Sequence, residues 1–131
     1  MNKLGHSHVK HEVAQDMEAL MATLVPEPVY EFYPLGKKLS GNENIRRYYQ
    51  NFNTSILDRI SSTTTVDQWT SLDSHAMEVE MVLDVDGETQ VLRVLGILYR
   101  QGSLLGGERI YTSESALRLM LGPLFEELTD L

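Results

Sequence analysis

Apolar residues recur every three or four positions in three segments of the chain, the spacing of one face of an α-helix. The first segment runs from about His8 to Leu24, the second follows Ser40 and the third follows Ser113. Pro26 and Pro28 should end the first helix, because proline has no amide proton to donate. The pattern therefore predicts three helices, two early in the chain and one at its end.

The second helix has the clearest start signal. Ser40-Gly41-Asn42-Glu43 has the form of a capping box, in which the serine oxygen accepts a first-turn amide and the glutamate bonds back. Its predicted buried stripe consists of Ile45, Tyr48, Tyr49, Phe52 and Ile56. We expect Ser113 to cap the last helix and Gly122-Pro123 to break it.

Most of the region from about Ser62 to Tyr111 reads as strand. Ala76–Val85 largely alternates apolar with polar residues, and Asp86-Gly87 favours a tight antiparallel turn. Val91–Tyr99 is almost continuously apolar, which predicts a central strand covered on both faces.

A shorter strand is predicted within Val29–Leu39, where Pro34 suits an edge position. Strands in one run, with helices mainly before them, indicate the α+β class with helices on one face of a curved antiparallel sheet. With 131 residues, the chain is expected to form a single domain, 1–131, of which residues 1–7 should be mobile.

Composition narrows the function classes. The chain has no cysteine, which excludes thiol nucleophiles and disulfide frameworks. Its net charge of −8 argues against nucleic-acid binding, because an acidic surface repels phosphates. No apolar stretch reaches the roughly 18–20 residues that span a membrane, and the start lacks the apolar region of a secretory signal. We therefore expect a cytoplasmic protein without a membrane partner.

Three stretches in order carry a resemblance to a known family. They are Pro28–Phe32 followed by Gly41–Tyr49, Asp86-Gly87 between two long strands, and Gly107–Tyr111 leading into Leu117–Gly122. On these stretches the sequence resembles the SnoaL-like (polyketide-cyclase-like) branch of the NTF2-like superfamily. The resemblance implies an NTF2-like (cystatin-like) cone, in which a bent sheet wraps around the N-terminal helices and a mostly apolar pocket opens between them.

The resemblance also sets the functional alternatives. It implies a protein that binds a hydrophobic small molecule, with no cofactor, and homodimers that form through the sheet face. If the protein is an enzyme, we expect isomerase, cyclase, dehydratase or hydrolase chemistry by acid–base catalysis; the alternative is a non-catalytic association module. Whether it is catalytic, and on which substrate, the sequence leaves open.

Enzymes of this fold place an acid or base and a hydrogen-bond donor in an apolar pocket, where a carboxyl pKa rises and donors strengthen. His75 shares the inward side of Met77 and is a candidate base, or else a strand-end histidine bonded to backbone or water. Tyr30 and Phe32 lie on one side of the early strand, so Tyr30 is a candidate donor, or else a core residue.

Two acids are further catalytic candidates. Asp67 shares a face with Trp69, and an indole beside a carboxyl raises its pKa; the alternative is a solvent-facing acid. Asp16 adjoins Met17 on the apolar stripe of the first helix, although acids on helices are mostly solvated. The residues predicted to line the pocket are Phe32, Tyr49, Phe52, Trp69, Met77 and Met17.

The sequence departs from the family at one functional position. SnoaL-like cyclases tend to carry an acid–base aspartate shortly after the last strand, where this chain has Ser113, so the resemblance does not extend to their chemistry. Glu108 and Arg109 are expected to support strand pairing or the dimer. His6, His8 and His11 have a spacing that can bind zinc or nickel, but no carboxylate-rich segment surrounds them and ligand geometry cannot be read from so short a cluster. We therefore expect no metal.

Overall fold

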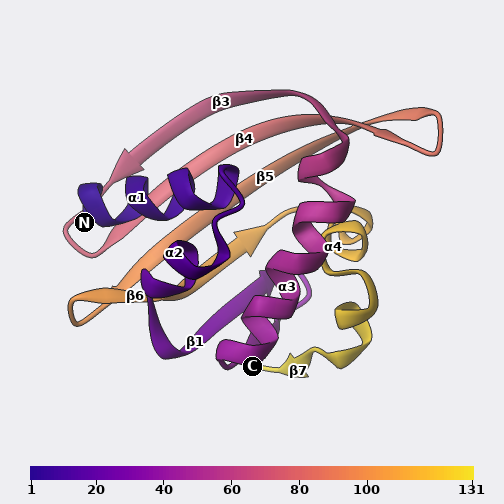
Figure 1. The fold of residues 1–131 in the computed structure, drawn as a ribbon. Coiled ribbons are helices and arrows are strands. Elements are labelled where there is room, and N and C mark those ends of the chain that lie inside the picture. Colours follow the sequence, from indigo (N-terminus) through magenta and orange to yellow (C-terminus); the bar gives the residue numbers. More distant parts are fainter.

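A computed structural model describes all residues, 1–131, as four α-helices, two short 3-10 helices and one mixed sheet (Figure 1). The helices are α1 (Asn2–Val13), α2 (Met17–Ala22), α3 (Asn42–Ser55), η1 (Leu57–Arg59), α4 (Glu114–Leu121) and η2 (Gly122–Glu127). The strands are β1 (Leu24–Tyr33), β2 (Lys37–Ser40), β3 (Ile60–Thr70), β4 (Ser74–Val85), β5 (Glu88–Gln101), β6 (Leu104–Tyr111) and β7 (Thr129–Asp130). None of the helices combines the length and the apolar character that crossing a bilayer requires.

The sheet has the order β3-β4-β5-β6-β1-β2-β7, and all neighbours are antiparallel except β1 and β6. Its long strands curve over α1, α2 and α3 (Figure 1). Helix α3 packs on β1 and β2, and α1 packs on β4 and β6. The predicted α+β cone is therefore confirmed, and its core lies between the helices and the concave face of the sheet.

The N-terminal segment differs from its prediction. The helix expected over His8–Leu24 is two helices, because Gln15 adopts a left-handed φ of 55° and Asp16 caps a new helix by accepting from the Ala19 amide. Residues 2–7, which we expected to be mobile, form the first turns of α1, where Gly5 is buried.

The prolines also act differently from the prediction. Helix α2 ends at Ala22, before Pro26 and Pro28, and both prolines lie inside β1, where the register to β6 shifts between Leu24 and Val29. That irregularity is the physical consequence of two residues that cannot donate to the ladder. Strand β1 is an inner strand rather than an edge, and Pro34 lies in the turn that follows it.

The start of α3 lies one residue later than the capping box predicts. Gly41 occupies the N-cap position and makes no side-chain cap, whereas Ser40 ends β2, paired with Val29. The other end signals are confirmed: Ser113 accepts from the Ala116 amide and caps α4, which ends at Leu121 with Gly122 as its C-cap. Strand β5 is central as predicted, but only its inward face is covered by helices, since Val91 on its outer face is 59% exposed.

Candidate functional site

A cavity of about 390 Å³ lies between the concave face of the sheet and the helices α1 and α3. Thirteen of its twenty lining residues are hydrophobic, so the site is mostly apolar. The side chains that can carry chemistry are few: the Tyr48 hydroxyl, on one of those thirteen residues, and the polar residues Glu12, Gln15, Thr63, Thr65, His75 and Glu108. An apolar cavity with a few convergent polar groups has the composition of a small-molecule site.

Strand register explains which sheet residues face the cavity. His75 pairs with Leu98, and Leu98 pairs with Glu108, so these three residues form one row across β4, β5 and β6. The next row along the strands pairs Met77 with Gly96. Because successive residues of a strand point to opposite faces, both rows project into the cavity while the residues between them face outward.

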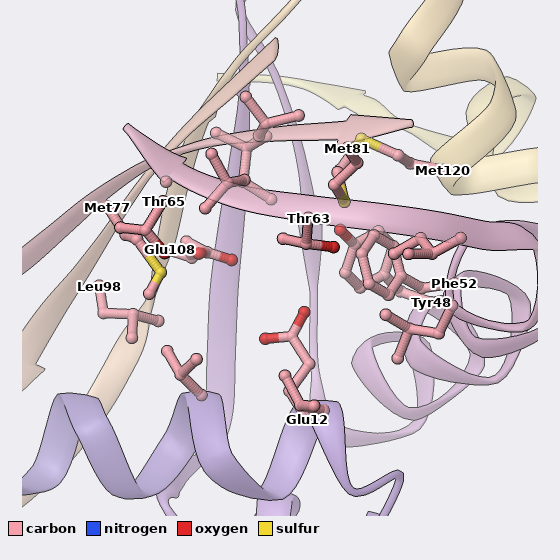
Figure 2. A pocket seen from close by; sticks show the side chains of 18 of the residues that line it. Glu12, Tyr48, Phe52, Thr63, Thr65, Met77, Met81, Leu98, Glu108 and Met120 are labelled. Atoms are coloured by element: carbon pink, nitrogen blue, oxygen red, sulfur yellow. The ribbon is translucent and has the colours of Figure 1, made fainter. Parts of the chain in front are cut away.

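Glu12 and Glu108 reach into the same space from opposite sides. Figure 2 shows the Glu12 carboxyl rising from α1 and the Glu108 carboxyl entering from the sheet. Burial raises the pKa of Glu12 to about 7. Burial, and then the nearby Glu12 charge, raise the pKa of Glu108 well above its usual range. At neutral pH the pair therefore holds at least one proton, with one group ready to donate it and the other to accept.

Gly96 makes room for the Glu108 carboxyl. A Cβ atom built on Gly96 would lie 2.6 Å from Glu108 Oε2, far inside van der Waals contact. A glycine at this point of β5 costs sheet stability and is explained here by the close approach of a side chain. The sequence thus shapes the sheet around this carboxyl.

Tyr48 adds a hydroxyl to the cavity wall. It lies beside Phe52 in the lining, both on the buried face of α3. No hydrogen bond joins the Tyr48 hydroxyl to the chain, whereas the neighbouring Tyr49 bonds both His8 and Tyr30. Burial raises the pKa of Tyr48 well above its usual value, so Tyr48 stays a neutral donor at neutral pH.

His75 lies at one end of the first row and is 1% exposed. Its Nδ1 lies 3.0 Å from the Thr70 hydroxyl oxygen, and its Nε2 has no hydrogen-bond partner. Burial, and then the nearby His6, lower the pKa of His75, so the imidazole is neutral at pH 7. Gly5 of α1 packs directly on it: a Cβ there would lie 2.7 Å from His75 Cβ.

A second group of buried polar side chains lies outside the cavity lining. His8 contacts the Thr23 hydroxyl at 2.7 Å through Nδ1 and the Tyr49 hydroxyl at 3.1 Å through Nε2, and Tyr49 bonds Tyr30. Tyr30, one of the candidate donors, is therefore fully buried with its hydroxyl already engaged. It lies on the inward face as predicted, opposite Glu108 in the register of β1 and β6.

The remaining candidates divide by face. Asp67 and Trp69 lie opposite Glu78 and Ala76, on the outer side of β3, because the register to β4 shifts between Thr65 and Asp67. Thr63 and Thr65, before this bulge, line the cavity.

Of the residues expected to line the pocket, Phe52 and Met77 do. Phe32 and Tyr49 belong to the buried core, Met17 packs against that core from α2, and Trp69 is 50% exposed. Asp16 is an exposed N-cap. Among the predicted catalytic residues, only His75 lines the cavity.

Sequence reasoning missed Glu12, Glu108 and Tyr48 as a set. Alternation along β6 offered a signal, since Glu108 shares a face with the buried Ile110. Glu12 lies three residues after Val9 and one before Val13, next to the apolar stripe of α1. Arg109, grouped with Glu108 in the prediction, faces outward, with its guanidinium over the Tyr99 ring.

Comparison with known proteins adds the identity of the fold. No protein-family model and no curated protein sequence matches the chain. Among solved structures, an NTF2-like protein of unknown function from Cytophaga hutchinsonii superposes with a TM-score of 0.70 at 11% identity, covering 86% of this chain and 99% of that one.

Two further solved structures agree with that assignment. A protein with a ketosteroid isomerase-like fold from Catenulispora acidiphila, in complex with trimethylamine, gives a TM-score of 0.64 at 15% identity, covering 91% and 92% of the two chains. An NTF2-like protein from Anabaena variabilis gives 0.67 at 15% identity, covering 86% and 88%. The architecture predicted from the sequence is confirmed: this chain has the NTF2-like fold, shared with ketosteroid isomerase-like proteins.

Proposed function

We propose that this protein binds an apolar small molecule in the cavity and isomerises it by cofactor-free proton transfer. The single observation that carries the proposal is the pair Glu12 and Glu108, two carboxyls that face one apolar cavity with raised pKa values. Two carboxyls in a dry site separate into a base and an acid, which is what a proton shuttle on carbon needs.

In the proposed reaction Glu12 is the base and Glu108 the acid. With a β,γ-unsaturated carbonyl compound, the Glu12 carboxylate removes a proton from the α-carbon. The electron pair of that C–H bond forms a double bond between the α-carbon and the carbonyl carbon, and the π pair of the carbonyl group moves to its oxygen. The resulting dienolate accepts hydrogen bonds from the protonated Glu108 and the Tyr48 hydroxyl. Glu12 then returns its proton to the γ-carbon, and the double bond moves into conjugation. Preorganised donors stabilise such an oxyanion strongly. In other enzymes, removing one oxyanion-hole donor by mutation raises the activation barrier by roughly 3–4 kcal/mol.

Two facts about this chain and its neighbours support an isomerase over other chemistry of the fold. Ser113 stands where the cyclases resembling this chain tend to have aspartate, and it is occupied as the cap of α4. A neighbour of similar structure is described as having a ketosteroid isomerase-like fold. Proton transfer at carbon uses only the groups that line this cavity.

The test is isomerisation of polycyclic β,γ-unsaturated ketones, followed by the ultraviolet absorbance of the conjugated product and by deuterium uptake from heavy water. We expect wild-type turnover and its loss in the double variant Glu12→Gln/Glu108→Gln. The exposed Glu114→Gln variant is the matched control and should behave as wild type. Turnover that survives in the double variant would refute the assignment.

We also propose that two copies associate through the outer face of the sheet, which is the surface a non-catalytic module would use. The outer face of β5 presents Leu95 and Ile97, and Val91 and Trp69 are at least half exposed on the same side. An apolar central strand left uncovered on one face favours association with a like surface. Ile97→Asp should convert a dimer to a monomer in sedimentation analysis; unchanged mass would exclude this face.

A further inference from the structure

The cavity holds two acids that no cationic side chain neutralises. Its lining includes Glu12 and Glu108 but neither lysine nor arginine. None of the ion pairs in the chain includes either carboxyl. Without a cation beside it a buried carboxyl keeps its proton, and burial raises the pKa of both residues. The cavity therefore presents two acceptor groups whose charge the chain itself does not balance.

The Tyr48 hydroxyl is a third group without a partner, on a different element. Tyr48 is 2% exposed and lines the cavity, and its hydroxyl makes no hydrogen bond in the chain. The oxygen keeps some accessible surface, because His75 Nε2 is the only unpartnered buried side-chain atom that has none. The hydroxyl therefore opens into the space that the two carboxyls share (Figure 2). A buried hydroxyl without a partner costs free energy, and a ligand that donates a hydrogen bond to its oxygen recovers part of that cost.

The two carboxyls are held in the cavity by regular elements. Glu12 lies in the last turn of α1, where the helix dipole adds negative potential, and the basic residues of that turn do not line the cavity. Glu108 lies within β6, where Gly96 of β5 leaves room for its carboxyl. The Glu12 charge acts on Glu108 and raises its pKa, so one positive charge placed between them stabilises both.

The rest of the lining suits the apolar part of an organic cation. The rings of Tyr48 and Phe52 line the cavity beside the carboxyls, and the faces of aromatic rings attract cations. The sheet contributes Met77, Met81 and Leu98, which have no group that competes for an ammonium. A compact hydrocarbon body fits a cavity of about 390 Å³.

We infer that the cavity also binds organic cations: amines with a compact apolar body, whose ammonium N–H groups donate to Glu12 and Glu108, with the Tyr48 hydroxyl oxygen as a further acceptor. This inference rests on the proposed small-molecule site and goes beyond the proposed reaction, whose ketone substrate is neutral. An amine in this position takes the place of the proton on the carboxyl pair. It therefore occupies both the base and the acid, and inhibits isomerisation in competition with the ketone.

The test uses three compounds with one rigid hydrocarbon cage and three different charges. They are 1-aminoadamantane, a cation at neutral pH, 1-adamantanol, which is neutral, and adamantane-1-carboxylate, an anion. Calorimetric titration of the wild-type protein at pH 8 should give at least about tenfold tighter binding of the amine than of the alcohol, because hydrogen bonds between charged groups are the stronger ones. The carboxylate should bind most weakly.

The pH dependence of binding reports the exchange of a proton for the amine. The amine selects the form with an ionised Glu12, whose pKa is about 7, so its affinity should rise about tenfold from pH 6 to pH 8 while that of the alcohol does not. An aliphatic amine stays charged over this range. Tyr48 and His75, the other titratable groups of the lining, stay neutral, because burial raises the pKa of the first and lowers that of the second. The same holds for the groups behind the wall: Tyr30, Tyr49 and His8.

Variants assign the preference to the carboxyls. In Glu12→Gln the amine should lose most of its advantage over the alcohol, together with the rise in affinity near pH 7. In Glu108→Gln the advantage should shrink and the rise should remain. The exposed Glu114→Gln is the matched control and should keep the wild-type affinities. The alcohol reports whether each variant still folds with an intact cavity, because its binding does not need a carboxylate.

Each contrary result has a distinct meaning. Equal wild-type affinity for amine and alcohol, or a preference that is undiminished in Glu12→Gln, overturns the binding of cations and leaves the proposed isomerase intact. Absence of ketone turnover with an intact preference for the amine overturns the reaction and leaves the cation site. Failure of all three compounds to bind overturns the cation site together with the proposed small-molecule site.

Discussion

Two groups of polar side chains lie on the concave side of this sheet, and they differ in how many of their hydrogen-bonding atoms have partners within the chain. The first comprises Tyr30, Tyr49, His8 and Thr23, and every member is hydrogen-bonded within the chain. The second lines the cavity and comprises Glu12, Glu108, Tyr48 and His75. Its members keep donors and acceptors free.

The satisfied group has one consistent direction of hydrogen bonding. Thr23 gives its proton to the Leu20 carbonyl at 2.6 Å, so it accepts from His8 Nδ1. His8 Nε2 must then accept from Tyr49, and Tyr49 accepts from Tyr30. Burial lowers the pKa of His8 to about 3. The ring is therefore neutral at pH 7, as this series of hydrogen bonds requires. A fully hydrogen-bonded network of this kind stabilises a core. The group that lines the cavity has unpaired donors and acceptors, which a bound ligand could use.

The largest expected effect is on catalysis by the group that lines the cavity. Glu12→Gln keeps the shape but removes the base, so turnover of β,γ-unsaturated ketones should fall about 10³-fold, within the range for losing a general base. In the wild type, turnover should rise with pH through about 7, the pKa of Glu12. A pH–rate profile of the wild type and of Glu12→Gln measures both the rise with pH and the loss of turnover. A wild-type profile centred near the pKa of an ordinary carboxyl would contradict the role of Glu12 as the base.

The second effect is on stability, and it depends on pH. The folded chain holds protons on Glu12 and Glu108 that the unfolded chain releases near pH 4.5, so the free energy of unfolding should fall as pH rises from about 4.5 through 7. For Glu12 alone the free energy of unfolding should fall by up to about 3 kcal/mol. Solvent in the cavity screens the carboxylate and makes this fall smaller.

His8 acts in the opposite direction, but only below pH 6.5. Its lowered pKa makes stability rise with pH between about 3 and 6.5 and leaves it constant above that range. Denaturant unfolding at pH 6.5 and 8 therefore isolates the carboxyls. The free energy of unfolding of Glu12→Gln should fall less over that interval than that of the wild type. An equal fall would show that the pKa of Glu12 is not raised by burial.

The third effect compares adjacent tyrosines, one from each group. Tyr49→Phe leaves His8 Nε2 and the Tyr30 hydroxyl unpartnered, so it should lower the free energy of unfolding by about 2 kcal/mol. Tyr48→Phe removes a hydroxyl that bonds nothing in the chain and should cost less than about 0.5 kcal/mol, while lowering turnover. Denaturant unfolding and the ketone assay separate the two roles, and equal destabilisation would remove the distinction between the groups.

Periodicity predicted the helices, the strands and their class, because burying one apolar face is what the sequence pattern encodes. It failed where one residue changed the geometry. The bulge after Thr65 turns Trp69 and Asp67 outward and Thr70 inward, and the left-handed Gln15 ends α1 just after Glu12. Neither event has a composition signal, and both decide which side chains meet in the cavity.

The smallest effects concern the two acids that the sequence favoured. Asp16→Ala should lower stability by about 0.5–1 kcal/mol, because it removes the N-cap of α2, and it should leave turnover unchanged. Asp67→Asn should change neither, since Asp67 is exposed on the outer face and accepts only from the Gln68 amide. Measured beside Glu12→Gln, these variants compare acids of similar sequence setting that differ in one physical respect, enclosure by apolar side chains. A loss of turnover in Asp67→Asn that matched Glu12→Gln would mean that the outer face, rather than the cavity, carries the chemistry.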